Sequence, residues 1–294
     1  MKTKPIAPIS ERFTRDTGFT LTELIVVVAV VAILALVLPR SLAVMHTKST
    51  GTSCLSNARQ LIFAIQVYSA DFSGALPPNP DDGNTTPGLN WCPGIAGRGG
   101  AQEFNPDILD DPSRSLLVPY GVNHLHFRCP ADPRVGVYTG PKPELRGQRI
   151  LSARTFSMNG AVGTDGYAAG GRAPFHGPWL NNSHTHQRSG PWQVYGNVAD
   201  FVNPGPSQTF VLIDEDHRGL NDGHFALGMQ VAEWLDLPGS YHNKSASVAF
   251  ADGHTELHPW RDPRTTFTGS SFVRTQVPGS VDWLWLSSHT SARK

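Results

Sequence analysis

Apolar side chains are concentrated near the beginning of the sequence. Residues 24–38 form an uninterrupted apolar run, and counting from Phe19 extends it to the length of about 20 residues that a membrane-spanning helix needs. Only Thr20, Thr22 and Glu23 interrupt the longer stretch. The preceding residues carry more basic than acidic side chains, so the positive-inside rule predicts a cytoplasmic N-terminus and export of everything after the run. We therefore predict a membrane span over about residues 19–38.

A second apolar pattern follows with the spacing of a helix. Between residues 55 and 69, apolar positions recur every three to four residues, which is typical of an amphipathic helix. Ser73 and Gly74 supply a stop signal. The two patterns together predict one long helix over residues 19–71, with Pro39 and the Ser/Thr-rich segment 47–53 as the places where it can bend.

The remainder, residues 72–294, reads as a globular head with long loops and short strands. The run at 209–213 is almost continuously apolar, as expected of a central buried strand. Asp252 and Gly253 separate two further strand signals and predict a hairpin with a two-residue type I′ turn. The expected fold class is α+β, a long helix packed on an antiparallel sheet. The expected strands cover residues 154–158, 209–213, 247–251 and 254–257.

Composition and charge narrow the classes of function. The 294 residues carry 24 Lys plus Arg and 24 Asp plus Glu, so no bulk positive field attracts nucleic acid. Charged residues make up 16%, while there are 29 Gly and 24 Pro, which favours a loop-rich domain over a helical bundle. The sequence contains no Gly-x-Ser-x-Gly motif, phosphate-binding loop or dinucleotide fingerprint. We therefore expect neither an enzyme nor a nucleic-acid partner.

The start of the apolar run carries a specific motif. The segment GFTLTEL at residues 18–24, followed by the run and Pro39, resembles the type IV prepilin signature shared by type IV pilins and type II secretion pseudopilins. This resemblance implies that residues 1–18 are a leader, that prepilin peptidase cleaves after Gly18, and that it N-methylates Phe19. It also implies a pilin-like fold, with the second half of the long helix packed on the head.

Glu23 is the unusual residue of the apolar segment. A carboxylate in lipid needs an opposite charge, and the α-amine of Phe19 on a neighbouring subunit can supply it. The buried charge would then favour side-by-side assembly with other pseudopilin subunits through the helix.

The head contains a weaker motif. His242, nine further residues and Asp252-Gly253 resemble the H-X9-DG pattern, here at residues 242–253, of a prepilin-type, processing-associated C-terminal domain. This second resemblance implies an architecture more than an activity. Further similar stretches are CLSNARQ at 54–60, RCPAD at 128–132, SMNG at 157–160 and PSQTFVLIDE at 206–215.

Several polar residues could hold a metal ion. If the strands that end near Asp214 and Asp252 are neighbours, both carboxylates emerge at one end of the sheet, where Asp216 and His242 can join them. Oxygen ligands would favour Ca²⁺, which related pseudopilins bind in a C-terminal loop, and histidine-rich ligation would favour Zn²⁺. Alternatively, Asp252 only shapes its turn, Asp214 caps a loop and His242 bonds to a turn backbone.

The three cysteines leave three alternatives open. All would lie outside the cytoplasm after insertion, where disulfides form. A Cys54–Cys129 bridge comes first because both residues lie in the family-like stretches, and Cys92–Cys129 is the rival. All three can instead be buried thiols.

The leading hypothesis is a pseudopilin-like structural subunit of a type II secretion or type IV pilus-like filament. It would cross the bacterial inner membrane once, with a cytoplasmic N-terminus and a periplasmic head. One alternative is a membrane-anchored binding module for a glycan or protein, with tryptophans as stacking platforms. Another is a metal-dependent hydrolase.

Overall fold

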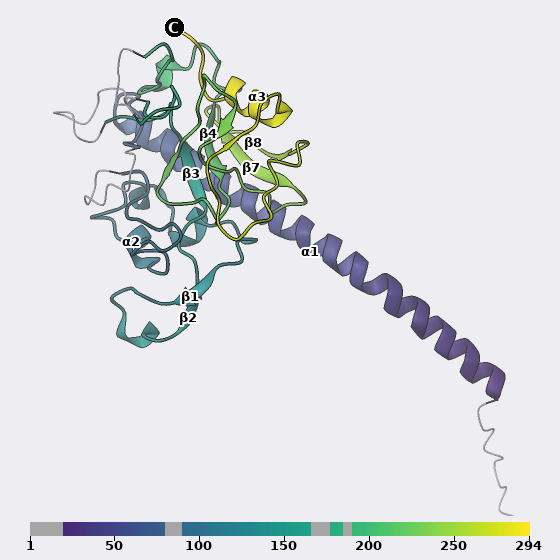
Figure 1. Ribbon diagram of the computed structural model, residues 1–294. Coiled ribbons are helices and arrows are strands. Elements are labelled where there is room, and N and C mark those ends of the chain that lie inside the picture. Colours follow the sequence, from purple (N-terminus) through teal and green to yellow (C-terminus); the bar gives the residue numbers. More distant parts are fainter. Residues whose placement is uncertain (1–19, 80–89, 166–176, 185–189) are drawn as a thin grey trace, which may run out of the picture. The chain divides into compact units, whose positions relative to one another are not determined.

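The computed structural model describes residues 20–79, 90–165, 177–184 and 190–294, and for residues 34–48 it describes the backbone alone (Figure 1). The chain divides into two compact units, Met1–His46 and Thr47–Lys294. The helix α1 (Leu21–Asp71) begins in the first unit and ends in the second.

The predicted long helix is confirmed over Leu21–Asp71. Its last turn is closed by the backbone N–H of Gly74, which donates to the carbonyl of Ser69 at 2.7 Å. Ser73 and Gly74 both have positive φ, 57° and 84°, as helix-ending residues commonly do. Pro39 and the segment 47–53 do not interrupt the assigned helix.

In the first unit, the described apolar side chains of α1 are exposed. They include Leu21 at 75% exposure and Ile33 at 61%. Within the described residues, no helix meets the length and hydropathy required to cross a membrane.

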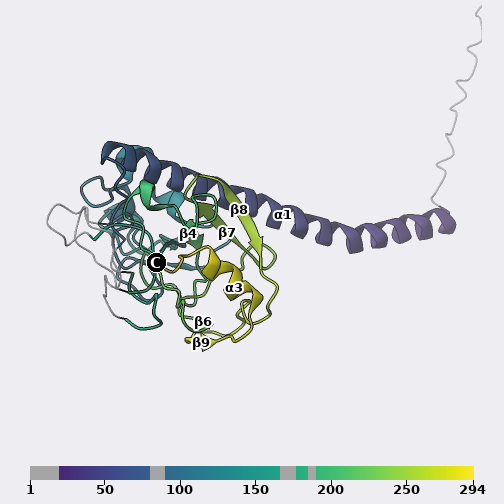
Figure 2. The same ribbon diagram turned by 90° about the horizontal axis from the view of Figure 1, so that it is seen from above.

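In the second unit, α1 buries one side. Ala58, Leu61, Ile62 and Ile65 are at most 1% exposed, and they repeat at the three- and four-residue spacing of one helix face. Cys54 continues this buried stripe one turn earlier. The same part of α1 lies along the hairpin formed by β7 (Ser245–Phe250) and β8 (Thr255–Pro259), as Figure 2 shows.

The hairpin belongs to a five-stranded sheet in the order β5-β3-β4-β7-β8. Its strands include β3 (Phe156–Asn159) and β4 (Phe210–Asp214), so the four predicted strands are all present. The expected sheet was antiparallel, whereas β5 (His224–Phe225) pairs with β3 in parallel. A strand of two residues is too short to leave an alternating pattern in the sequence.

The turn between β7 and β8 differs from the prediction. A type I′ turn needs positive φ at both central residues, but of Asp252 and Gly253 only the glycine has it, at 94°. The N–H of Gly253 donates to the carbonyl of Phe250 at 2.9 Å, and the N–H of Phe250 donates to the carbonyl of His254 at 3.0 Å. The connection is therefore a three-residue loop with glycine at the bulge position.

The C-terminal helix α3 also packs against the sheet. The ring of Phe250 in β7 makes an edge-on contact with Trp285 of α3 (Val281–Ser288), at 6.5 Å between centroids. Every residue of β4 and β7 is buried, so the core lies on these two strands.

The remaining described elements are α2 (Asp107–Asp110), β1 (Val135–Val137), β2 (Arg149–Leu151), β6 (Glu233–Trp234), β9 (Thr275–Gln276) and four 3₁₀ helices, η1 (Val118–Tyr120), η2 (His124–Phe127), η3 (Pro143–Leu145) and η4 (Val198–Asp200).

Candidate functional site

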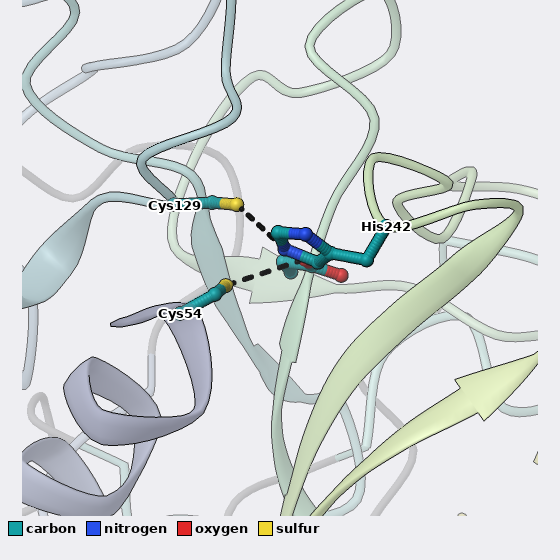
Figure 3. A group of neighbouring side chains, drawn as sticks. Cys54, Cys129 and His242 are labelled. Atoms are coloured by element: carbon teal, nitrogen blue, oxygen red, sulfur yellow. Dashed lines mark hydrogen bonds and ion pairs between the residues drawn. The ribbon is translucent and has the colours of Figure 1, made fainter. Parts of the chain in front are cut away.

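Four buried side chains meet where α1 contacts the head. Cys54, Cys129, Asp214 and His242 each offer one ligand atom, and these atoms all lie within 4.8 Å of one another. We call these four residues the buried cluster. Figure 3 shows the side chains of Cys54 and Cys129 pointing toward the His242 ring from two different segments. None of the four is more than 3% exposed.

Three of the six distances between the ligand atoms are close to those of a tetrahedral zinc site, and all six are within 4.8 Å. Nε2 of His242 lies 3.1 Å from Sγ of Cys129 and 3.8 Å from Oδ2 of Asp214. The thiol of Cys54 donates to the same Oδ2 at 3.6 Å. Tetrahedral zinc, with bonds of about 2.3 Å to sulfur and about 2.0–2.1 Å to nitrogen or oxygen, would hold its ligand atoms about 3.3–3.8 Å apart.

Cys54 and Cys129 are brought together by α1. Cys54 lies on the buried stripe of the helix, and Cys129 follows the short helix η2. One turn after Cys54, the Nδ2 group of Asn57 donates to the carbonyls of Leu125 and Arg128, at 3.1 and 2.9 Å. These two hydrogen bonds fasten the segment that carries Cys129 to the helix.

Asp214 and His242 are set by the sheet. Asp214 ends β4, and its Oδ1 accepts a hydrogen bond of 2.9 Å from the backbone N–H of Ser247 in β7. His242 precedes β7 across a tight turn in which Asn243 and Lys244 both have positive φ, 54° and 62°. Both side chains therefore lie at the end of the sheet where β4 finishes and β7 begins.

Gly51 lets Leu257 of β8 approach the helix beside His242. A Cβ atom at this position would lie 3.6 Å from Nδ1 of His242 and 3.0 Å from Cδ1 of Leu257. Glycine inside a helix costs about 1 kcal/mol relative to alanine, so its presence on the buried side of α1 is explained by this close packing.

Burial favours the uncharged forms of the cluster. It raises the pKa of the Cys54 thiol well above its ordinary value and raises the pKa of the Asp214 carboxyl to about 8. It also lowers the pKa of the His242 ring to about 4. A divalent cation would reverse the preference of the thiol and the carboxyl, because it supplies the opposite charge that the buried site lacks.

The sequence placed two of these four residues in a metal site and two in a disulfide. Asp214 and His242 lie together as expected. Of the alternatives for the cysteines, the structure has the buried thiols and not a Cys54–Cys129 or Cys92–Cys129 bridge, because all three cysteines are free and buried. The two pairs meet because Cys54 lies on the buried stripe of α1, which faces the sheet.

Asp216 and Asp252 lie outside the buried cluster. Asp216 accepts a 2.7 Å hydrogen bond from Nε of Arg218. The expectation that Asp214 and Asp252 emerge at the same end of the sheet is wrong, because their strands are antiparallel neighbours. Asp252 therefore lies at the opposite end, in an exposed turn, where its Oδ1 is 2.6 Å from Nδ1 of His254.

The predicted processing site precedes α1 in the sequence. Gly18 and Phe19 are outside the described residues. Glu23 is exposed in the first turn, where its Oε2 accepts hydrogen bonds from the backbone N–H of Thr20 at 2.8 Å and from its hydroxyl at 2.7 Å. The Thr20 hydroxyl in turn accepts from the N–H of Glu23 at 3.3 Å, which makes a reciprocal capping box.

Residues 14–39 match the family model of the prokaryotic N-terminal methylation motif. The match supports a type IV pilin-like protein. It contains Gly18, Phe19 and Glu23, and it points to a processed, N-methylated structural protein rather than to an enzyme. No curated protein and no solved structure matches the chain.

Proposed function

We propose that this pilin-like protein is a pseudopilin-like structural subunit of a type II secretion or type IV pilus-like filament. Prepilin peptidase cleaves it after Gly18 and methylates Phe19, and the mature chain assembles with other pseudopilin subunits through α1. The observation that carries the proposal is the methylation motif at residues 14–39, in which Glu23 becomes the fifth residue of the mature chain.

The exposed apolar part of α1 supports the same proposal. A continuous apolar surface needs a partner, and in the first unit the side chains of Leu21, Ile25 and Ile33 are each at least 60% exposed. The lipid of the bacterial inner membrane and the helices of other subunits both supply such a partner. In this proposal the protein crosses that membrane once, with the head in the periplasm.

The alternative of a glycan-binding head gains no support from three of the seven tryptophans. All seven lie in the described part of the chain; three are buried and four are half-buried. Trp91, Trp234 and Trp260 belong to the hydrophobic core. Aromatic stacking platforms require an open ring face, which these three do not provide.

The direct test is mass spectrometry of the full chain extracted from membranes of the native bacterium. We expect a chain that begins at Phe19 with one added methyl group on its amine. A matched Gly18→Val variant should keep residues 1–18 and carry no methyl group. An intact wild-type chain that retains its leader would overturn the proposal.

A second test separates two roles of Glu23. Glu23→Gln keeps the capping box, because glutamine can replace glutamate there, but it removes the charge. We expect Glu23→Gln to insert into the membrane normally and to lose most of its crosslinking to neighbouring subunits. Thr20→Ala, which removes the cap and keeps the carboxylate, should retain crosslinking. If only Thr20→Ala impairs crosslinking, Glu23 acts through the cap and not through its charge.

A further inference from the structure

We propose that Cys54, Cys129, Asp214 and His242 bind one Zn²⁺ ion, which fixes the second half of α1 to the head. The four ligand atoms already converge within 4.8 Å, and they come from four separate segments of the chain. This proposal does not depend on cleavage at Gly18 or on filament assembly.

The donor set selects zinc over calcium. Two sulfurs, one ring nitrogen and one carboxylate oxygen form a soft to intermediate set, which suits Zn²⁺. Calcium requires six to eight oxygen ligands, and the buried cluster offers oxygen only from Asp214. The calcium site expected from the sequence is therefore not the one that these residues build.

The surroundings hold the ligands in position. The N–H of Ser247 binds Oδ1 of Asp214, which leaves Oδ2 facing Cys54 and His242. Gly239 allows the close approach of this carboxylate, because a Cβ atom there would lie 2.6 Å from Oδ1. Such hydrogen bonds from outside the ligand set orient metal ligands in known sites.

The site is closed, which indicates a structural role. A catalytic zinc ion keeps one position open for water or substrate, whereas four protein ligands complete a tetrahedron. Cys54, Cys129 and Asp214 are fully buried and His242 is 3% exposed. The structure therefore gives no support at this site to the hydrolase considered from the sequence.

Zinc would join parts of the chain that are distant in sequence. Cys54 and Asp214 are separated by 160 positions, and Cys129 and His242 by 113. When the ion binds, both thiols and the carboxyl of Asp214 release their protons, while the His242 ring binds in its neutral form. The dication then neutralises most of the charge of the two thiolates and the carboxylate, and the centre keeps a net charge of −1.

The test is the metal content of the full chain, purified in detergent without a polyhistidine tag and without chelator. We expect about one zinc ion per chain by elemental mass spectrometry. Cys54→Ser and His242→Ala should each lose at least about nine-tenths of it, because zinc affinity falls steeply when one of four ligands is removed. Cys92→Ser is the matched control, since Cys92 is a buried free thiol outside the buried cluster, and it should retain the zinc.

Cobalt substitution gives an independent measurement on the wild-type chain. After the zinc is removed by a chelator, added Co²⁺ should produce the absorption bands of tetrahedral cobalt and thiolate-to-cobalt charge-transfer bands, which the zinc form lacks. This readout remains informative if the ligand variants fail to fold. A zinc-free wild-type chain, a Cys54–Cys129 disulfide in non-reduced peptides, bound calcium in place of zinc, or equal zinc in Cys54→Ser and Cys92→Ser would each overturn the proposal.

Discussion

The two ends of β7 carry the two ends of the H-X9-DG pattern, and their surroundings are opposite. His242, just before the strand, is buried beside two cysteines and Asp214. Asp252 and Gly253, just after it, lie in a turn in which Asp252 is exposed. The Asp252 carboxylate contacts His254, two residues away, and the Asp252 backbone N–H donates to the carbonyl of Pro206 at 3.3 Å. A single sequence pattern therefore joins a buried group of potential ligands to a solvent-exposed turn.

The spacing between the two ends follows from the length of β7. The six residues of β7 and its two flanking turns fill the interval from His242 to Asp252. The spacing therefore fixes the length of one central strand, and it does not bring the histidine and the aspartate to a common site. The two ends are expected to respond differently to substitution.

The largest effect is expected at the buried end. His242→Ala should abolish zinc binding and lower the free energy of unfolding by about 4 kcal/mol when free zinc is about a thousandfold above its dissociation constant. This corresponds to a decrease of about 8–16 °C in the melting temperature for a unit of this size, measured by circular dichroism of the full chain in detergent.

Asp252→Asn is the control for that prediction. Asparagine suits the same turn, so the free energy of unfolding should change by less than about 0.5 kcal/mol. Equal decreases in the two variants would show that the ends of β7 do not differ in the way proposed.

A smaller effect is expected at the contact between α1 and the segment of Cys129. Asn57→Ala removes both hydrogen bonds of the Asn57 side chain and should lower the free energy of unfolding by about 2 kcal/mol. It should also accelerate the transfer of zinc to a chelator, because the Cys129 segment is held less firmly.

Gln66→Ala provides the comparison along the same helix. Its Nε2 group donates to the carbonyl of Ala251, next to the exposed turn, at 3.1 Å. This substitution should cost about 1 kcal/mol and leave the rate of zinc transfer unchanged. Faster transfer from Gln66→Ala than from Asn57→Ala would contradict the assignment of the two contacts.

An effect as small as that of Gln66→Ala is expected from Gly253→Ala. The φ of Gly253 is 94°, a conformation that a residue with a Cβ atom rarely adopts, so the substitution should cost about 1 kcal/mol through strain in the turn. The zinc content should equal that of the wild type. A loss of zinc from this variant would show that the exposed turn and the buried cluster are coupled through β7.

Much of the fold could be predicted because it is encoded locally. The helix ends at Asp71 as Ser73 and Gly74 indicate, and the apolar run before Asp214 forms the central strand β4. The parallel pairing of β5 could not be predicted, because its two residues carry no periodic pattern. The turn at Asp252 was assigned the wrong type, because Asp-Gly is compatible with more than one hairpin loop.

The buried cluster could be predicted only in halves. The sequence places Asp214 and His242 in a candidate metal site with Asp216 and Asp252. It offers Cys54 and Cys129 separately, as a candidate disulfide or as buried thiols. The meeting of the two pairs depends on the packing of α1 on the sheet, which brings together positions 160 residues apart. The misplacement of Asp252 has a different cause, namely that antiparallel pairing reverses the direction of neighbouring strands.

The edges of the five-stranded sheet bear on how copies of the chain can join. An exposed, regular edge strand can recruit a strand from another molecule. Here one edge strand, β5, has only two residues, and the other, β8, carries Glu256 and His258 and ends at Pro259, which lacks an N–H group for pairing. Both edges resist extension of the five-stranded sheet from one molecule to the next, so this sheet is protected against aggregation through strand addition.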